Sequence, residues 1–313
     1  MAGRSAKKKN STAPLKKAVT LIAVFVVLLF TVLDLTGLVS FDSLLIKAGV
    51  EDKPAEHAQT EVHFIDVGQG DSTLVISQGE VMLIDSGDKD DSNKIEKYLE
   101  KQGVTELKYL IATHPHADHI GEMSEIIDQF HVEKFIMPKV KADMMPTTTI
   151  YEKMLKSIKA KGLKITQAKP MEFELGSCKV ELFTPKNDYD DLNNYSTLVK
   201  ITDGENSFLI TGDCETTEEK DILSQGYDVS AKVLKAGHHG SSTSSGVGFL
   251  NKVMPRYAVI SCGKGNKYGH PHEETVTRLK KYASHLYVTA DVGTIVFSSD
   301  GEGLSVSAEK GEK

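Results

Sequence analysis

The sequence of 313 residues lacks several features that mark special classes of protein. It has no tryptophan and no long tract of proline or glycine, and its 40% hydrophobic and 26% charged residues are typical of a globular chain. The three cysteines, Cys178, Cys214 and Cys262, are odd in number and far apart. A disulfide framework or a cysteine-rich metal site is therefore not expected, and the thiols should be free or buried.

Basic residues are scarce in most of the chain. Residues 1–50 carry seven basic and two acidic side chains, a balance of about +5, whereas the whole chain has a formal charge of −7, so the rest carries about −12. An acidic body is not typical of a protein that grips nucleic acid through many phosphate contacts. If the substrate is a phosphodiester, metal ions would have to supply much of the attraction.

The sequence has only one long apolar run, which excludes a polytopic channel. Residues 18–41 are mostly apolar, are interrupted by Asp34, and are long enough to span a bilayer, which needs about 20 residues. The lysine-rich residues 1–17 should stay in the cytoplasm, which makes residues 42–60 a stalk and places the body outside the cell membrane. A cleaved signal peptide, which also predicts export, and a buried helix are the alternatives. The first interpretation predicts a single-pass membrane protein with an extracytoplasmic catalytic domain.

The body, residues 61–308, alternates short strands with helices and ends in a polar tail, residues 309–313. The expected strands are 62–67, 72–76, 81–84, 109–112, 134–137, 173–175, 179–183, 196–202, 207–211, 233–235 and 257–261, with a last hairpin through 300–301. The expected helices are 94–102, 118–130, 148–161, 216–224, 247–254 and 271–283. Two strand-rich meanders interleaved with helices predict a single α/β domain in which two sheets stack face to face with helices outside.

Three histidines and a carboxylate occupy six positions directly after an apolar strand. They are His114, His116, Asp118 and His119. Two histidines two residues apart in a bend can reach one ion, and Asp118 and His119, at the start of the next helix, can reach a second. Imidazole and carboxylate ligands suit Zn²⁺ or Mn²⁺, and also iron. The sequence therefore predicts one or two divalent metal ions and a catalytic role for Asp118.

This motif resembles the signature of the metallo-β-lactamase superfamily. The resemblance implies an αββα four-layer sandwich with a one- or two-metal site on its upper edge. It makes Asp85 the buried carboxylate that orients ligand histidines. It makes Asp213 the carboxylate that bridges two metals. The late ligand is His238 or His239, of which His239 is favoured and the other would face the substrate.

One ligand of many superfamily members has no counterpart in this chain. His131 is the only histidine between the two metal motifs, and it comes too early. The stretch Leu192-Asn-Asn-Tyr-Ser-Thr-Leu198 stands where that ligand is expected. One metal would then have fewer protein ligands and be completed by water and substrate oxygens. Open coordination positions are what catalysis requires.

Four further stretches resemble the exported metallo-β-lactamase domain of ComEC-type competence proteins. They are residues 64–72, 193–196, 238–241 and 266–272. The resemblance covers residues 61–300. Because that domain is regarded as a nuclease for one DNA strand, the resemblance implies phosphodiester hydrolysis. The family commonly has aspartate where this chain has His116, and this departure puts the metal set in question.

Polar side chains beside these motifs are candidates for contact with the substrate. Ser241 and Ser242 can donate hydrogen bonds to non-bridging phosphate oxygens, unless their loop is merely polar and flexible. Asn194 and Ser196 can do the same near the metals. His270 can protonate a leaving oxygen, or it is structural.

Three polar residues flank the turn at Gly68. Asp66 is expected to be structural or to support a metal ligand from behind. Gln69 and Asp71 are expected at the rim of the site, where Gln69 would bind substrate.

These sequence features are compatible with three functions. The leading hypothesis is an exported, metal-dependent phosphodiesterase or nuclease. The second is hydrolysis of another exported ester, namely a phosphorylcholine-type ester, a lactone or a β-lactam, although the missing histidine and the His-His-Gly-Ser stretch weigh against lactones and β-lactams. The third is a non-catalytic envelope protein that binds metal or a partner. The sequence makes no obligate protein partner evident.

Overall fold

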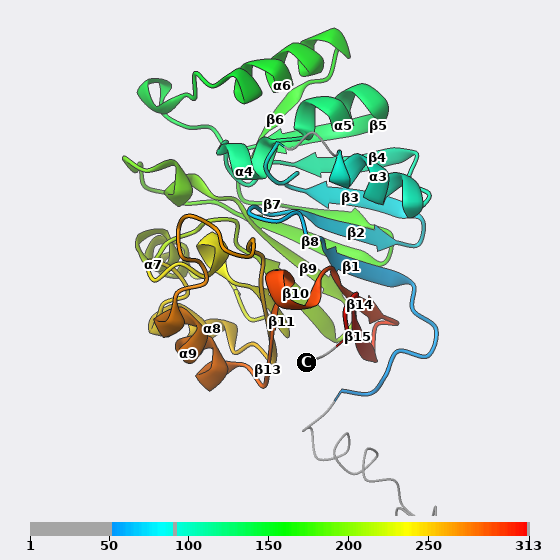
Figure 1. The fold of residues 1–313 in the computed structure, drawn as a ribbon, viewed down its shortest axis with the longest axis vertical. Helices are drawn as coiled ribbons and strands as arrows, with labels where there is room; N and C mark the ends of the chain where they lie inside the picture. The colour runs from blue at the N-terminus through cyan, green and yellow to red at the C-terminus, as the bar shows by residue number, and fades with distance from the viewer. Residues whose placement is uncertain (1–51, 90–92, 312–313) are drawn as a thin grey trace, which may run out of the picture. The chain divides into compact units, whose positions relative to one another are not determined.

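The computed structural model describes residues 52–89 and 93–311 (Figure 1). The expected membrane-spanning segment, residues 18–41, lies outside the described residues, as do residues 1–17 and the first part of the expected stalk. Within the described ranges, no helix is long and apolar enough to cross a membrane.

The first sheet has eight strands in the order β15-β14-β1-β2-β3-β4-β5-β6. Its strands are β1 (Thr60–Phe64), β2 (Thr73–Ser77), β3 (Glu80–Ile84), β4 (Glu106–Ile111), β5 (His131–Met137), β6 (Ile165–Gln167), β14 (Ile295–Ser299) and β15 (Leu304–Ala308). Strands β1 to β3 pair antiparallel and β3 to β6 parallel, so helices are needed to connect the parallel strands. The C-terminal hairpin returns to pair with β1.

The second sheet has seven strands in the order β13-β12-β11-β10-β9-β8-β7. Its strands are β7 (Met171–Leu175), β8 (Cys178–Phe183), β9 (Leu198–Asp203), β10 (Asn206–Ile210), β11 (Val233–Lys235), β12 (Tyr257–Ile260) and β13 (His285–Val288). The first four pair antiparallel, and β10 to β13 pair parallel. Both sheets therefore contain an antiparallel part and a parallel part.

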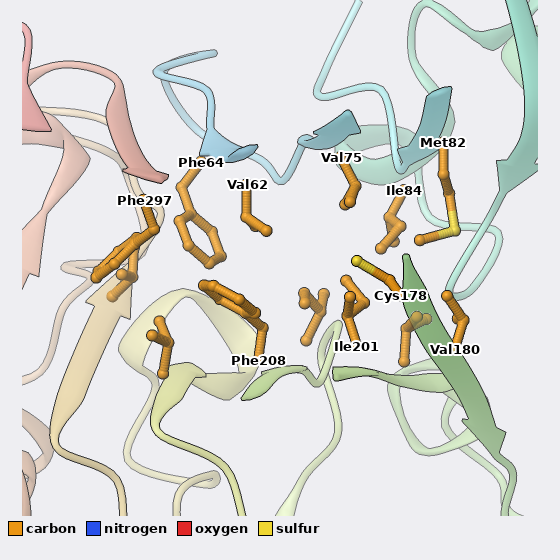
Figure 2. Packing of buried hydrophobic residues seen from close by; sticks show 14 of the residues in the cluster. Val62, Phe64, Val75, Met82, Ile84, Cys178, Val180, Ile201, Phe208 and Phe297 are labelled. Carbon is orange, nitrogen blue, oxygen red and sulfur yellow. The ribbon is translucent and has the colours of Figure 1, made fainter. Parts of the chain in front are cut away.

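The two sheets pack face to face through alternate side chains of their strands. Val62 and Phe64 of β1 point between the sheets, as the period of two along a strand requires (Figure 2). The ring of Phe297 lies edge to face with Phe64 and Phe208, with centroids 5.9 and 6.0 Å apart. Burying one such ring contributes roughly 1.5–3 kcal/mol. This apolar layer joins the two halves of the body.

Helices cover the outer faces of both sheets (Figure 1). They are α3 (Lys94–Lys101), α5 (Met123–Gln129) and α6 (Thr149–Ala160) on the first sheet, and α7 (Thr216–Ser224), α8 (Val247–Val253) and α9 (Glu273–Tyr282) on the second. In β3, Met82 and Ile84 face the other sheet whereas Val81 and Leu83 face helices. The predicted α/β sandwich of two sheets with helices outside is confirmed, and the three cysteines are free and buried.

The helix expected over residues 118–130 is broken into α4 (Ala117–Ile120) and α5. A side chain at Gly121 would collide with the backbone of Asp88 and Lys89, so this segment packs against the turn after β3. The carboxylate of Glu122 accepts hydrogen bonds from the first amides of α3, at 3.2 and 3.3 Å. The break holds α4 as a separate short turn, which carries Asp118 and His119.

Candidate metal centre

The predicted ligands lie where strands end. Asp85 follows β3, His114 follows β4, Asp213 follows β10 and His239 follows β11. Asp71 precedes β2. Side chains at the carboxyl ends of parallel strands converge on one edge of a sheet, which is where α/β folds bind ligands. The fold thus gathers residues that are distant in the sequence.

One group of possible ligand atoms comes from Asp71, His119, Asp213 and His239, whose atoms all lie within 4.8 Å of one another. Nε2 of His119 lies 3.2 Å from Oδ1 of Asp213, and Nε2 of His239 lies 3.5 Å from it. Within the part of the chain that the structure describes, these three buried atoms have no hydrogen-bond partner. Buried polar atoms without partners require an explanation, and converging imidazole and carboxylate atoms fit a divalent cation.

A second group comes from His114, His116 and Asp213. Nε2 of His114 lies 3.0 Å from Nδ1 of His116 and 3.8 Å from Oδ2 of Asp213. Asp213 therefore turns one carboxylate oxygen toward each group. This is the position expected of a carboxylate that bridges two metal sites.

His119 is oriented from behind by Asp85. Its Nδ1 lies 2.8 Å from Oδ2 of Asp85, which leaves Nε2 to face the first group. The Asp85 carboxylate also accepts hydrogen bonds from the amide and the hydroxyl of Thr113, at 2.7 and 2.6 Å. Asp85 has a φ of +60°, a conformation that costs a non-glycine residue about 1–3 kcal/mol and is typical of functional sites.

His239 is oriented by the carboxylate of Asp71, which was predicted to lie at the rim of the site. Its Nδ1 lies 3.2 Å from Oδ1 of Asp71 and 3.0 Å from the carbonyl oxygen of Ser261. Asp71 is 3% exposed and pairs with the ammonium group of Lys235, which is 1% exposed. The expectation that Asp71 lies at the rim was therefore wrong. The available signal was a lysine at the end of the buried strand β11.

Asp118 lies on the other side of the same ring. Its Oδ2 is 3.3 Å from Nε2 of His239, the atom that points toward Asp213. Three carboxylates lie near His239: Asp118 and Asp213 face its Nε2, and Asp71 contacts Nδ1 on the other side of the ring. A carboxylate behind a ligand histidine fixes its ring orientation and raises its basicity as a ligand.

His238 and His239 both have left-handed backbone angles, with φ of +48° and +52°, and their side chains lie in different surroundings. The His238 side chain is 22% exposed, whereas that of His239 is 1% exposed. Nδ1 of His238 lies 3.3 Å from Glu215, which also accepts hydrogen bonds from Thr243 and Asn194. The buried ring of His239 thus lies within the first group of possible ligands, and His238 lines the cavity. Glu215 was not among the site residues predicted from the sequence.

Opposite charges shift the pKa values of this centre. Burial alone would lower the pKa of His239, but Asp213 and Asp71 raise it to about 10. Burial would raise the pKa of Asp213, but His239 and His119 hold it well below its usual range. A divalent ion would compete with protons for these imidazoles, so its affinity should rise with pH.

An open cavity of about 550 Å³ leads to the two groups. His116, Asp118, Asp213, His238 and His239 form its metal side. Its other polar lining comes from Gln69, Thr148, Asn193, Tyr268 and His270. Burial and the neighbouring His239 and His238 lower the pKa of His270 to about 4, so this ring is neutral at neutral pH.

Four residues expected to contact substrate do not line this cavity in the described part of the chain. Ser196 is buried and its hydroxyl accepts from the amide of Asp213 at 3.0 Å, so it supports a ligand instead. Asn194 is buried and bonds Glu215. Ser241 bonds Thr243, and Ser242 donates its amide to His272. The 3₁₀ turn Leu192–Tyr195 presents Asn193 to the cavity in place of Asn194.

The two remaining predicted residues lie on either side of the Gly68 turn. Gln69 lines the cavity, its Oε1 accepts from the amide of Gly263 at 3.2 Å, and its buried Nε2 has no hydrogen-bond partner. Asp66 accepts from the amide of Gly68 at 3.2 Å and lies 3.7 Å from Nζ of Lys310. Asp66 therefore holds the turn, and Gln69 offers an amide to the cavity.

Known proteins resemble this chain in sequence, and a solved structure resembles it in fold. The family model described as "Metallo-beta-lactamase superfamily" matches residues 65–264. ComE operon protein 3 of Bacillus subtilis is 31% identical over 265 residues, which are 78% of this chain and 34% of that protein. Recombination protein 2 of Haemophilus influenzae is 29% identical over 75% of this chain and 28% of its own length. The chain thus spans about a third of the length of these relatives.

A third relative and one solved structure extend the comparison. Competence protein ComA of Neisseria gonorrhoeae is 28% identical over 83% of this chain and 36% of its own length. A variant of the β-hydroxylase CmlA has a TM-score of 0.52 at 12% identity and covers 82% of this chain and 59% of that chain. At this identity, the likeness to CmlA concerns the fold alone.

Proposed function

Because the chain belongs to the metallo-β-lactamase superfamily, we propose that it is a metal-dependent phosphodiesterase that acts on nucleic acid. The resemblance of its motifs to competence proteins is confirmed by the relatives. The observation that carries the proposal is the pair of ligand groups that share Asp213 beside an open cavity. Superfamily membership and this buried cluster together indicate a metal-dependent hydrolase.

The donor set fits two divalent ions. His119, His239 and Asp213 of the first group would hold one ion together with Asp118, whose Oδ2 faces Nε2 of His239. His114, His116 and Asp213 would hold the other. When bound, such ions supply an activated water and an electrophilic centre for phosphoryl oxygens. Imidazole and carboxylate donors suit Zn²⁺ and Mn²⁺ alike.

Several side chains of the cavity suit a phosphodiester. Nε2 of Gln69 is a buried donor without a partner, so it can bind a non-bridging oxygen. His238 is held by Glu215 with its other ring nitrogen 3.8 Å from Asp213, at the mouth of the site. His270 is neutral at neutral pH and would protonate a leaving oxygen only after taking up a proton.

The turn Leu192–Tyr195 favours a phosphoester over a lactam or lactone. It stands where many superfamily members place a histidine, and it offers the neutral amide of Asn193 to the cavity. The group of His114 and His116 therefore keeps a side on which substrate oxygens can bind. This supports phosphoester chemistry without excluding a phosphorylcholine-type ester.

A substrate panel tests the function. We expect the full-length protein in detergent, with Mn²⁺ or Zn²⁺, to hydrolyse bis(p-nitrophenyl) phosphate and single-stranded DNA but not nitrocefin or a lactone. A phosphorylcholine ester completes the panel. Asp118→Ala should lower kcat about 10²-fold, because the carboxylate facing Nε2 of His239 is lost. Glu100→Ala, an exposed carboxylate on α3, is the matched control and should keep full activity.

Three outcomes would overturn this function. Turnover confined to a phosphorylcholine ester, nitrocefin or a lactone would establish the second hypothesis. Metal bound at full occupancy without any turnover would establish a non-catalytic binding protein. Full activity of Asp118→Ala would refute the assigned ligand set.

We also propose that residues 18–41 anchor the chain as a single-pass membrane protein with its catalytic domain outside the cytoplasm. The lysines of residues 1–17 and the length of the apolar run support this orientation. Protease added to intact cells should digest the body while a cytoplasmic marker stays intact. A body that is protected until the cells are lysed would rule out export.

A further inference from the structure

The loop after β12 holds an exposed aromatic ring at the metal cavity. Tyr268 lines the cavity and is 51% exposed. Asn266 braces the loop, because its Oδ1 accepts from the amides of Tyr268 and His270 at 3.1 and 3.0 Å. Its Nδ2 donates to the carbonyl oxygen of Gly263 at 2.8 Å. The loop is therefore fixed by its own hydrogen bonds, and the tyrosine is presented without being packed into the core.

The surroundings of this ring suit a planar, anionic ligand. Tyr268 is nearly parallel to His270, at 22° with centroids 5.6 Å apart, so the two rings form a step that leads into the cavity. Nζ of Lys267 lies over the Tyr268 ring, 5.0 Å from its centre, so a stacked base would take the place of this exposed side chain. Lys264 is exposed on the same loop. These lysines place positive charge beside the ring on an otherwise acidic body.

The rest of the cavity supplies apolar surface next to the metal ligands. Pro115, Ala117, Pro146 and Leu192 contribute to its lining. A phosphate group alone gains nothing from such surface, whereas a base or sugar attached to the phosphate does. Polar metal ligands, an aromatic step and apolar walls together match one nucleotide and its phosphodiester.

We propose that Tyr268, next to Lys267, is a stacking subsite for the nucleobase beside the scissile phosphate. Stacking on an aromatic side chain tolerates any base, because every base has a flat face. A base inside a duplex has both faces covered by its neighbours and cannot use this subsite. The inference rests on the phosphodiesterase function proposed above and adds the feature that selects single strands.

The test compares one dinucleotide with its abasic analogues. The full-length protein is given deoxyadenylyl-deoxyadenosine, which has a single phosphodiester, or analogues in which tetrahydrofuran replaces one nucleoside. Tyr268→Ala should lower kcat/KM on the dinucleotide roughly 10- to 100-fold, in line with the effect of removing one stacked base. Tyr268→Phe keeps the ring and should stay within about threefold of wild type. On the analogue that lacks the stacked base, Tyr268→Ala should have the same kcat/KM as wild type.

A binding measurement separates this inference from the function on which it rests. The fluorescence of 2-aminopurine falls when it stacks, so a 2-aminopurine dinucleotide added to chelator-treated protein should be quenched by wild type and Tyr268→Phe but not by Tyr268→Ala. Quenching without cleavage of any phosphodiester would overturn the function and keep the subsite. Absence of quenching by the wild-type protein would overturn the subsite. So would a Tyr268→Ala variant whose kcat/KM falls by the same factor on the dinucleotide and on both analogues.

Discussion

Replacing Asp213 with alanine is expected to empty both metal positions and to lower phosphodiester turnover roughly 10⁴-fold. The reason is geometric, because Oδ1 lies near His119 and His239 while Oδ2 faces His114. Losing the ligand shared by two ions removes several kcal/mol of charge stabilisation, and each 1.36 kcal/mol is a tenfold change in rate. The first measurement is the metal content per chain after dialysis, which does not depend on activity.

Asp118→Ala is the matched comparison for Asp213→Ala. Asp118 contacts His239 of one group and is not part of the other, so its removal should reduce the metal content by about one ion per chain. A smaller loss of metal in Asp213→Ala than in Asp118→Ala would contradict the bridging role. Equal melting temperatures of the two variants in chelator would show that the difference arises from ligation and not from folding.

The parts of this centre that the sequence reveals are those fixed by short-range geometry. His114, His116, Asp118 and His119 follow one buried strand within a few residues, so their proximity is set by the chain itself. The apolar strands that become the sandwich core are visible for the same reason, since their alternation is local. Strands β6 and β13 went unpredicted, because they are short and do not alternate between buried and exposed residues.

The features that could not be predicted from the sequence depend on contacts between distant segments of the chain. The break at Gly121 exists because the turn after β3 packs against it, which no helical periodicity can register. Asn193 and Asn194 differ only in which way a 3₁₀ turn directs them. Asp71 looked like an exposed turn residue until the fold placed Lys235 beside it.

Replacing Lys235 with methionine is expected to destabilise the folded protein by up to about 3–5 kcal/mol, because it removes the ammonium group that pairs with the buried Asp71 carboxylate and leaves the His239 ring as its cationic partner. Burial would raise the pKa of Asp71, but Lys235 and His239 keep it below its usual value. Methionine retains the length and the apolar stem of lysine, so packing changes little. The free energy of unfolding in urea, measured in chelator, reports the loss without a contribution from bound metal.

The matched control is Lys200→Met. Lys200 is also buried, but its partner Asp228, at 2.8 Å, is 75% exposed and can be hydrated when the lysine is lost. We therefore expect a cost of at most about 1 kcal/mol for this variant. If Lys200→Met and Lys235→Met lowered the free energy of unfolding by similar amounts, the loss of stability would come from burial of the lysine stem and not from the ion pair.

The double variant Lys235→Met with Asp71→Asn separates the structural role of the pair from its role at the metal. Two neutral side chains leave no unpaired charge, so most of the stability should return. Metal affinity should not return, because asparagine places no negative charge beside Nδ1 of His239 and the ring becomes a weaker ligand. Loss of such a carboxylate typically lowers metal affinity 10- to 100-fold. If the double variant bound metal as tightly as wild type, Asp71 would serve only to neutralise Lys235, and the backing of His239 would rest on the Ser261 carbonyl alone.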